Sequence, residues 1–200
     1  MKHPSTRILF DYWNKRRGSR QAPERRDIDP VDISGALGDT FVLAADFVDH
    51  LRIRLAGTRV CALFGREIKG ESFAALWDQA SRTAVDEMLA AVVGEVEGAV
   101  ADVVGCAADG TRVELEMLIL PLAYAGHTRV RALGALAPPD LPFWLGEKPV
   151  VEVSLTRLLP AGLDRTEPAT RSRWLPLGGR LRRGFVVYSG GRVPPAEPPG

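Results

Sequence analysis

The sequence lacks most features that would assign a function directly. Only two cysteines, Cys61 and Cys106, occur among 200 residues, too few for a disulfide framework. No stretch approaches the ~20 consecutive apolar residues that a membrane-spanning helix needs. The N-terminal residues also lack the apolar centre of a secretory signal. We therefore expect a reduced, cytoplasmic protein.

Catalytic motifs are missing as well. The chain has no Gly-x-Ser-x-Gly elbow, phosphate-binding loop, His-Glu-x-x-His pair or Cys-x-x-Cys pair. Glu114 and Glu116 would lie on the same side of a strand, because successive side chains alternate between its two faces. Since they alternate with Val113 and Leu115, we place both carboxylates on the solvent face of a sheet. We expect no catalytic residues, no metal site and no enzymatic activity.

Charge is unevenly distributed along the chain. Residues 1–27 carry eight Lys/Arg against three Asp/Glu, and residues 165–192 carry seven Arg against one acidic residue. The middle, residues 28–164, has eleven basic and twenty acidic residues. Such flanks can bind nucleic acid or anionic lipid, or they can fold back onto the acidic core. The flanks lack the interleaved aromatics of a single-strand binder, so pairing within the chain is favoured.

Hydrophobic spacing predicts an α+β fold. The pattern indicates a helix capped by Ser5 and ended by Gly18, a short helix ended by Gly65, and a long helix over 81–96. In 50–56, Leu51, Ile53 and Leu55 alternate with arginines, which is typical of a half-buried strand. Asp109-Gly110 predicts a tight hairpin turn. The predicted strands are 40–47, 50–56, 98–108, 111–122 and 127–137. Their order favours one antiparallel sheet with helices on one face.

These elements predict four segments: an N-terminal amphipathic helix and linker, a core, a C-terminal extension and a disordered Pro-rich tail, at 1–27, 28–147, 148–192 and 193–200. Within the extension, 150–160 and 180–192 have strand-like composition. Leu9, Tyr12 and Trp13 share one face of the first helix and must be buried on the protein's own core or on a second copy. We take these three as candidates for homodimerisation.

The segment RLAGTRVCALFGREIKGESFAALW, residues 54–77, carries a family resemblance. Its ordered positions are Leu63-Phe64-Gly65, Glu67, Gly70, Phe73 and Leu76. With PFWLG at 142–146 and VVYSGGR at 186–192, it resembles the single-domain bacterial PAS family first catalogued as proteins of unknown function. The resemblance extends over roughly residues 7–192. It implies a PAS-like five-stranded antiparallel sheet with helices packed on one face. It also implies a sensory role in signal transduction, through small-molecule binding or protein–protein interaction.

In PAS domains a ligand, when present, lies between the short helices and the sheet. The resemblance gives seven pocket-lining candidates, for whose aromatic members core packing is the simpler interpretation: Cys61, Phe64, Phe73, Trp77, Met88, Val92 and Met117. Haem-binding relatives place a histidine on the long helix, and flavin photosensors carry an Asn-Cys-Arg-Phe-Leu-Gln motif; both are missing here. The cofactor is therefore unknown, and a small apolar ligand is possible.

The expected partners are a second copy of the chain and an unidentified signalling protein; nucleic acid and anionic lipid are disfavoured. Two alternatives remain open. One is a small α+β enzyme that uses the same cavity with acid/base groups. The other is a nucleic-acid or membrane-surface binder that uses the Arg-rich flanks.

Overall fold

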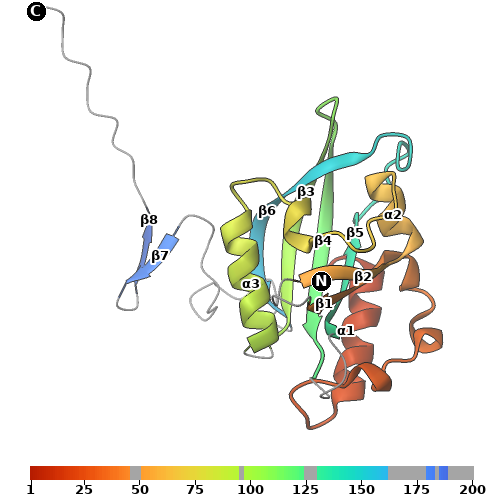
Figure 1. Ribbon diagram of the computed structural model, residues 1–200, viewed down its shortest axis with the longest axis vertical. Helices are drawn as coiled ribbons and strands as arrows, with labels where there is room; N and C mark the ends of the chain where they lie inside the picture. The colour runs from red at the N-terminus through yellow and green to blue at the C-terminus, as the bar shows by residue number, and fades with distance from the viewer. Residues whose placement is uncertain (46–50, 95–96, 124–129, 162–178, 183–184, 189–200) are drawn as a thin grey trace, which may run out of the picture.

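A six-stranded antiparallel sheet in the order β2-β1-β5-β4-β3-β6 forms the centre of the protein (Figure 1). The computed structural model describes residues 1–45, 51–94, 97–123, 130–161, 179–182 and 185–188. The strands are β1 (Thr40–Ala45), β2 (Leu51–Ala56), β3 (Ala99–Ala107), β4 (Arg112–Pro121), β5 (Val130–Ala137) and β6 (Val150–Pro160). A separate two-stranded sheet consists of β7 (Gly179–Arg182) and β8 (Phe185–Tyr188).

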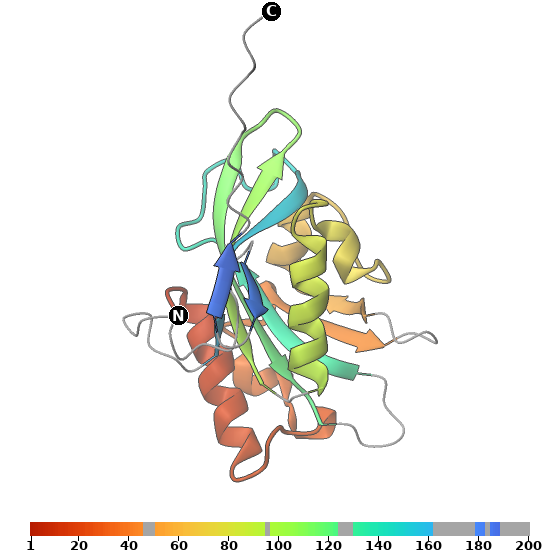
Figure 2. The same ribbon diagram turned by 90° about the vertical axis from the view of Figure 1, so that its left-hand side faces the viewer.

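Helices cover both faces of the sheet (Figure 2). The α-helices are α1 (Pro4–Arg17), α2 (Thr58–Phe64) and α3 (Arg82–Gly94), and the short 3-10 helices are η1 (Arg25–Asp27), η2 (Pro30–Ile33), η3 (Leu37–Asp39) and η4 (Phe73–Leu76). Side chains of α2, η4 and α3 pack in one core on the inner face, and α1 packs in a second core on the outer face. The predicted α+β fold is confirmed: the helices of the PAS-like core pack on one face, and the additional N-terminal helix covers the other.

The sheet has one strand more than predicted. The sixth strand, β6, comes from the segment that the sequence assigned to a C-terminal extension, and it pairs with β3. Val103 lies opposite Leu155, and Gly105 lies opposite Val153. A strand was expected at these residues, but its place beside β3 depends on pairing between segments about 50 residues apart in sequence.

Local signals predicted several element ends correctly. Helix α2 ends at Gly65, whose φ of 64° is left-handed and favours glycine. Gly110, with φ of 83°, closes the predicted hairpin turn between β3 and β4. The predicted cap of α1 was wrong: His3, not Ser5, caps the helix, because Nδ1 of His3 accepts a hydrogen bond from the Ser5 N–H at 3.1 Å. Pro4 begins the helix, where proline costs no hydrogen bond.

In the second half of β2, the side chains do not alternate between buried and exposed as predicted. Leu43 lies opposite Ile53 and Val42 opposite Leu55, so Arg54 forms a β-bulge between them. An extra residue in one strand shifts every following side chain to the other face. Ile53 is accordingly 1% exposed and Leu55 is 48% exposed.

Helix α1 is held on the outer face by a buried carboxylate. Glu116 of β4 is fully buried and accepts hydrogen bonds from the backbone N–H groups of Lys2 (2.7 and 2.8 Å) and His3 (3.0 Å). The Thr6 hydroxyl donates a further bond at 2.5 Å. The predicted solvent position is therefore wrong for Glu116, although Glu114 is exposed as expected. Burial of an unpaired carboxylate is costly, so Glu116 requires these donors.

A second carboxylate fixes the same end of α1. Asp39, in η3, is 2% exposed and accepts a hydrogen bond from the Ser5 hydroxyl at 2.6 Å. The Arg59 guanidinium donates two more at 2.7 Å, and this bonding to Asp39 raises the pKa of Arg59. Helices α1 and α2 are thus connected through one acidic side chain.

The segment that leads into α3, residues 78–81, is hydrogen-bonded to β6. The Asp78 carboxylate accepts bonds from the Ser154 hydroxyl (2.5 Å) and the Ser81 N–H (2.8 Å). The Ser81 hydroxyl accepts one from the Leu155 N–H at 2.9 Å, and the Asp78 N–H donates to the Val153 carbonyl at 2.9 Å. These bonds cover part of the free edge of β6, which would otherwise present unpaired backbone groups.

We predict that Glu116→Gln destabilises the protein by about 2–4 kcal/mol. The substitution replaces one charged carboxylate oxygen by an N–H₂ group, so the donors of Lys2, His3 and Thr6 share the single oxygen that remains. Urea unfolding measures the loss, and Glu114→Gln on the exposed side chain of the same strand serves as the control, with a change below ~0.5 kcal/mol. Equal effects of the two substitutions would contradict the role of Glu116.

We predict that the protein loses stability in acid as Asp78 becomes protonated. Burial alone would raise the pKa of Asp78, but hydrogen bonds from Ser154 and Ser81 outweigh it and lower the pKa below its ordinary value of 3.8. The unfolded chain then binds the proton more tightly, so stabilisation by Asp78 is complete above the unfolded pKa. It is lost as pH falls through the lower folded pKa. We expect Asp78→Asn to cost about 1–2 kcal/mol at pH 7 and progressively less below pH 4. A difference from wild type that stays constant down to pH 2 would refute this.

Candidate functional site

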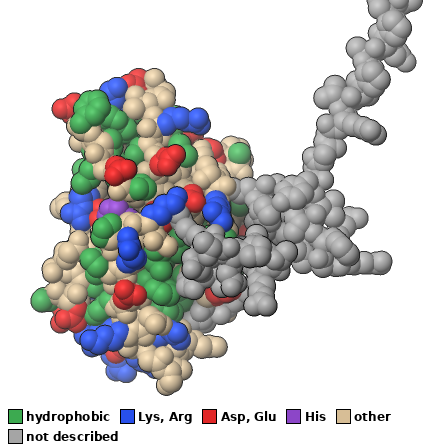
Figure 3. Space-filling view, turned by 180° about the vertical axis from the view of Figure 1, so that it is seen from behind, with side chains coloured by type: hydrophobic (Ala, Val, Ile, Leu, Met, Phe, Trp, Pro, Cys, Tyr) green, Lys and Arg blue, Asp and Glu red, His purple; other side chains and the backbone are tan. Residues whose placement is uncertain are grey.

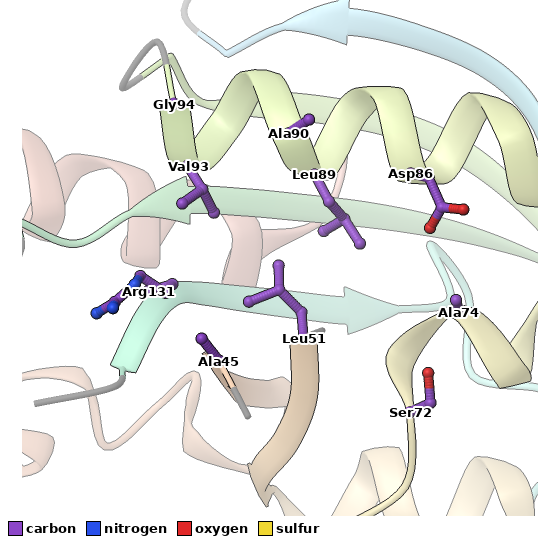
Figure 4. Close-up of a pocket in the computed structure, with 10 residues that line it drawn as sticks. All are labelled: Ala45, Leu51, Ser72, Ala74, Asp86, Leu89, Ala90, Val93, Gly94 and Arg131. Carbon is purple, nitrogen blue, oxygen red and sulfur yellow. The ribbon is translucent and has the colours of Figure 1, made fainter. Parts of the chain in front are cut away.

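A cavity of about 570 Å³ lies between α3 and one end of the sheet. Five of its lining residues come from α3, and the others come from the end of β1, the start of β2, the segment before and within η4, and the start of β5 (Figure 4). The lining residues are Ala45, Leu51, Ser72, Ala74, Asp86, Leu89, Ala90, Val93, Gly94 and Arg131. Its wall is mainly aliphatic, with three polar side chains.

The cavity stays open because small side chains lie beside the larger aliphatic ones. Leu51 projects from β2 toward Leu89 and Val93 of α3, and small residues on either side leave the space between them unfilled (Figure 4). Leu89, which is 7% exposed, also belongs to the inner core, so it separates the cavity from that core.

The structure places six of the seven predicted pocket residues in the inner core rather than around this cavity. Each of the six is at most 4% exposed, and none lines the cavity: Phe64, Phe73, Trp77, Met88, Val92 and Met117. Their assignment as ligand contacts stays a prediction. Sequence reasoning missed the lining of the cavity, although Leu89 and Val93 belong to the apolar stripe of the predicted long helix and Leu51 to the predicted strand.

Aromatic packing fills the space behind the cavity. The ring of Phe41 lies over Gly134, where an added Cβ would approach it within 2.3 Å, so β5 requires glycine at this position. Phe41 stacks on Phe73 at 5.4 Å between ring centroids, and Phe73 meets the edge of Trp77 at 5.8 Å. Nε1 of Trp77 is buried and has no acceptor among the described residues. An unpaired buried donor costs about 1–3 kcal/mol.

Cys61 lies apart from the cavity on α2, half-buried. Its Sγ is 3.7 Å from Oε1 of Glu67 and 3.9 Å from the Ala56 carbonyl oxygen. Burial and the neighbouring Glu67 carboxylate raise the pKa of the thiol. The protonated form is therefore favoured, whereas nucleophilic cysteines require a lowered pKa.

The proposed dimerisation residues pack within the chain. Leu9 is fully buried and Trp13 is 6% exposed, in the outer core with Leu118 and Leu120. Nε1 of Trp13 donates to the Pro121 carbonyl at 2.7 Å, and the half-buried Tyr12 hydroxyl accepts from the Asp29 N–H at 2.7 Å. Self-association through this face stays a prediction, and it would require α1 to leave the sheet.

The basic N-terminal flank pairs with nearby acidic groups, one of the two outcomes that the charge pattern left open. Arg16 pairs with Asp32 at 2.5 Å, and Lys2 pairs with Asp102 at 3.3 Å. Figure 3 shows basic and acidic side chains interspersed over the face of the molecule that it presents. Most of the basic segment 165–192 lies outside the described residues.

Among the residues that the structure describes, no group of three or more His, Cys, Asp or Glu is placed to hold a metal ion. Within the same residues, no helix is long and apolar enough to cross a membrane. Glu116, which could form a carboxylate pair with Glu114, is bonded to the start of α1 instead.

Several solved structures resemble the chain at low identity. The PAS domain of a protein from Colwellia psychrerythraea is 14% identical, with 55% of this chain and 97% of that chain covered and a TM-score of 0.40. The light-state LOV domain of the blue-light photoreceptor Aureochrome1 is 16% identical, with 57% and 90% covered and a TM-score of 0.41. A fungal LOV photoreceptor is 23% identical, with 51% and 74% covered and a TM-score of 0.41.

No curated protein matches the sequence. The family assignment comes from a family model described as a PAS domain, which matches residues 1–137. These residues include every element that lines the cavity, together with α1, α2, β3 and β4. Because the match covers more than half of the chain, the protein belongs to the PAS domain family.

Proposed function

We propose that this protein is a non-enzymatic sensory module that binds a small, mainly apolar molecule in the cavity beside α3 and signals by contact with another protein. Membership of the PAS family supports a sensory role in signal transduction. The observation that carries the proposal is the cavity itself, whose volume of about 570 Å³ lies within the range of small-molecule sites. Its aliphatic wall favours an apolar ligand body.

Buried groups behind the cavity support the same proposal. Leu89 faces both the cavity and the inner core, so a ligand that displaces it changes the packing around Phe73 and Trp77.

The signal would leave the cavity through α3. A ligand shifts a conformational equilibrium only if it binds one state better than another. Helix α3 supplies half of the cavity lining and is hydrogen-bonded to β6 through Asp78 and Ser81. A ligand that favours a different position of α3 therefore also changes the position of β6. The unidentified partner would bind there, and the protein would act in the cytoplasm.

Native mass spectrometry of freshly purified protein, with an absorption spectrum of the same sample, tests this function. We expect an additional mass that disappears on denaturation. Ala90→Phe fills the cavity from α3 and should abolish retention of that mass, because Ala90 lines the cavity. Glu87→Phe, on an exposed position of the same helix outside the lining, is the matched control and should retain it.

The same spectra report the mass of the assembly and so test the expected homodimer. Protein that retains no molecule, and that binds none of the probes n-octylamine, n-octanol and octanoate, would refute the ligand-sensing function. A ligand retained equally by both phenylalanine variants would place the binding site elsewhere.

A further inference from the structure

The polar side chains of the cavity are divided between its two ends. Asp86 and Ser72 lie at one end, and Figure 4 shows the Asp86 carboxylate pointing away from α3 and the Ser72 hydroxyl pointing toward α3, with Ala74 drawn between them. Arg131 lies at the opposite end, and its guanidinium points away from Leu51. Aliphatic side chains occupy the space between. The cavity therefore offers an anionic, acceptor-rich end and a long apolar wall.

The two charged ends differ in how they are occupied. Arg131 already interacts with other groups of the chain. Asp86 has no hydrogen-bond or ion-pair partner among the described residues. Arg82, one helical turn before Asp86, donates instead to the Trp77 carbonyl (3.2 Å) and to Oε1 of Gln79 (3.0 Å). A positively charged ligand group can therefore bind Asp86 without displacing another partner among the described residues.

We infer that the ligand is a linear aliphatic amine, with its ammonium group between Asp86 and Ser72. This inference rests on the proposed function and names the ligand class of the same cavity. An ammonium has three donors and no acceptor, which complements a carboxylate that only accepts and a hydroxyl that also can accept. Carboxylate–ammonium hydrogen bonds are about twice as strong as neutral ones.

The apolar wall sets the shape of the ligand body. From Asp86 to Val93 the axis of α3 advances about 10 Å, at 1.5 Å per residue. An extended aliphatic chain such as that of n-octylamine covers this distance and contacts Leu51, Leu89 and Val93. A bulky ring system lacks this shape, and a carboxylate head group would be repelled by Asp86.

Isothermal titration of the full-length protein at pH 7 with n-octylamine, n-octanol and octanoate tests the inference. We expect n-octylamine to bind at least about fivefold more tightly than n-octanol, and octanoate to bind most weakly. Asp86→Asn should remove the preference for the amine and leave the affinity for n-octanol unchanged. Ser72→Ala should weaken amine binding by about twofold. The matched control is Glu87→Gln, an exposed carboxylate on the same helix outside the lining, which should keep the preference.

The outcomes separate the inference from the proposed function. Octanoate bound most tightly, or all three probes bound equally, would overturn the amine assignment while leaving the cavity a binding site. An amine preference that survives Asp86→Asn would also overturn it. Failure of all three probes, with no retained molecule in the native spectrum, would overturn both. Asp86 is exposed, so the thermal unfolding of Asp86→Asn is expected to match wild type and to exclude misfolding as a cause.

Discussion

The carboxylate of Glu116, buried on the outer face of the sheet, constrains the rest of the architecture. A buried charge is tolerated only when several donors surround it. Here the donors are the N–H groups of Lys2 and His3 and the hydroxyl of Thr6. These hydrogen bonds fix the beginning of α1, and the helix then carries Leu9 and Trp13 across Leu118 and Leu120. The outer face over β4 and β5 is thereby closed by the protein itself.

With α1 covering the outer face, the functional site that we propose lies on the inner face. On the inner face, Phe73 and Trp77 of the motif segment pack against each other, and Phe41 packs between Phe73 and Gly134. The space that remains lies to one side, between α3 and β2, where side chains are small or aliphatic. A sensing role therefore depends on α3 more than on the motif segment, and the hydrogen bonds of Asp78 and Ser81 connect α3 to the strand that continues toward the C-terminus.

Charge has different roles on the two sides of the molecule. Glu116 and Asp39 are buried and fully bonded, and they hold secondary structure together. Asp86 is exposed at the edge of the cavity without a partner among the described residues, and in our inference its charge selects the ligand rather than stabilising the fold. Neither role can be recognised from residue type, because a glutamate and an aspartate on amphipathic elements look alike in a sequence.

The sequence by itself determined the elements and the fold family. Glycines at 65 and 110, the stripe of α3 and the alternation of β4 are local patterns, and each predicted its element within a few residues. The ordered motif from Leu63 to Leu76 indicated the PAS fold. Only the tertiary structure decided the bulge at Arg54, the place of β6 beside β3, the burial of Glu116 and the lining of the cavity. Each of these depends on which distant segment covers a given face, and local periodicity carries no information about that choice.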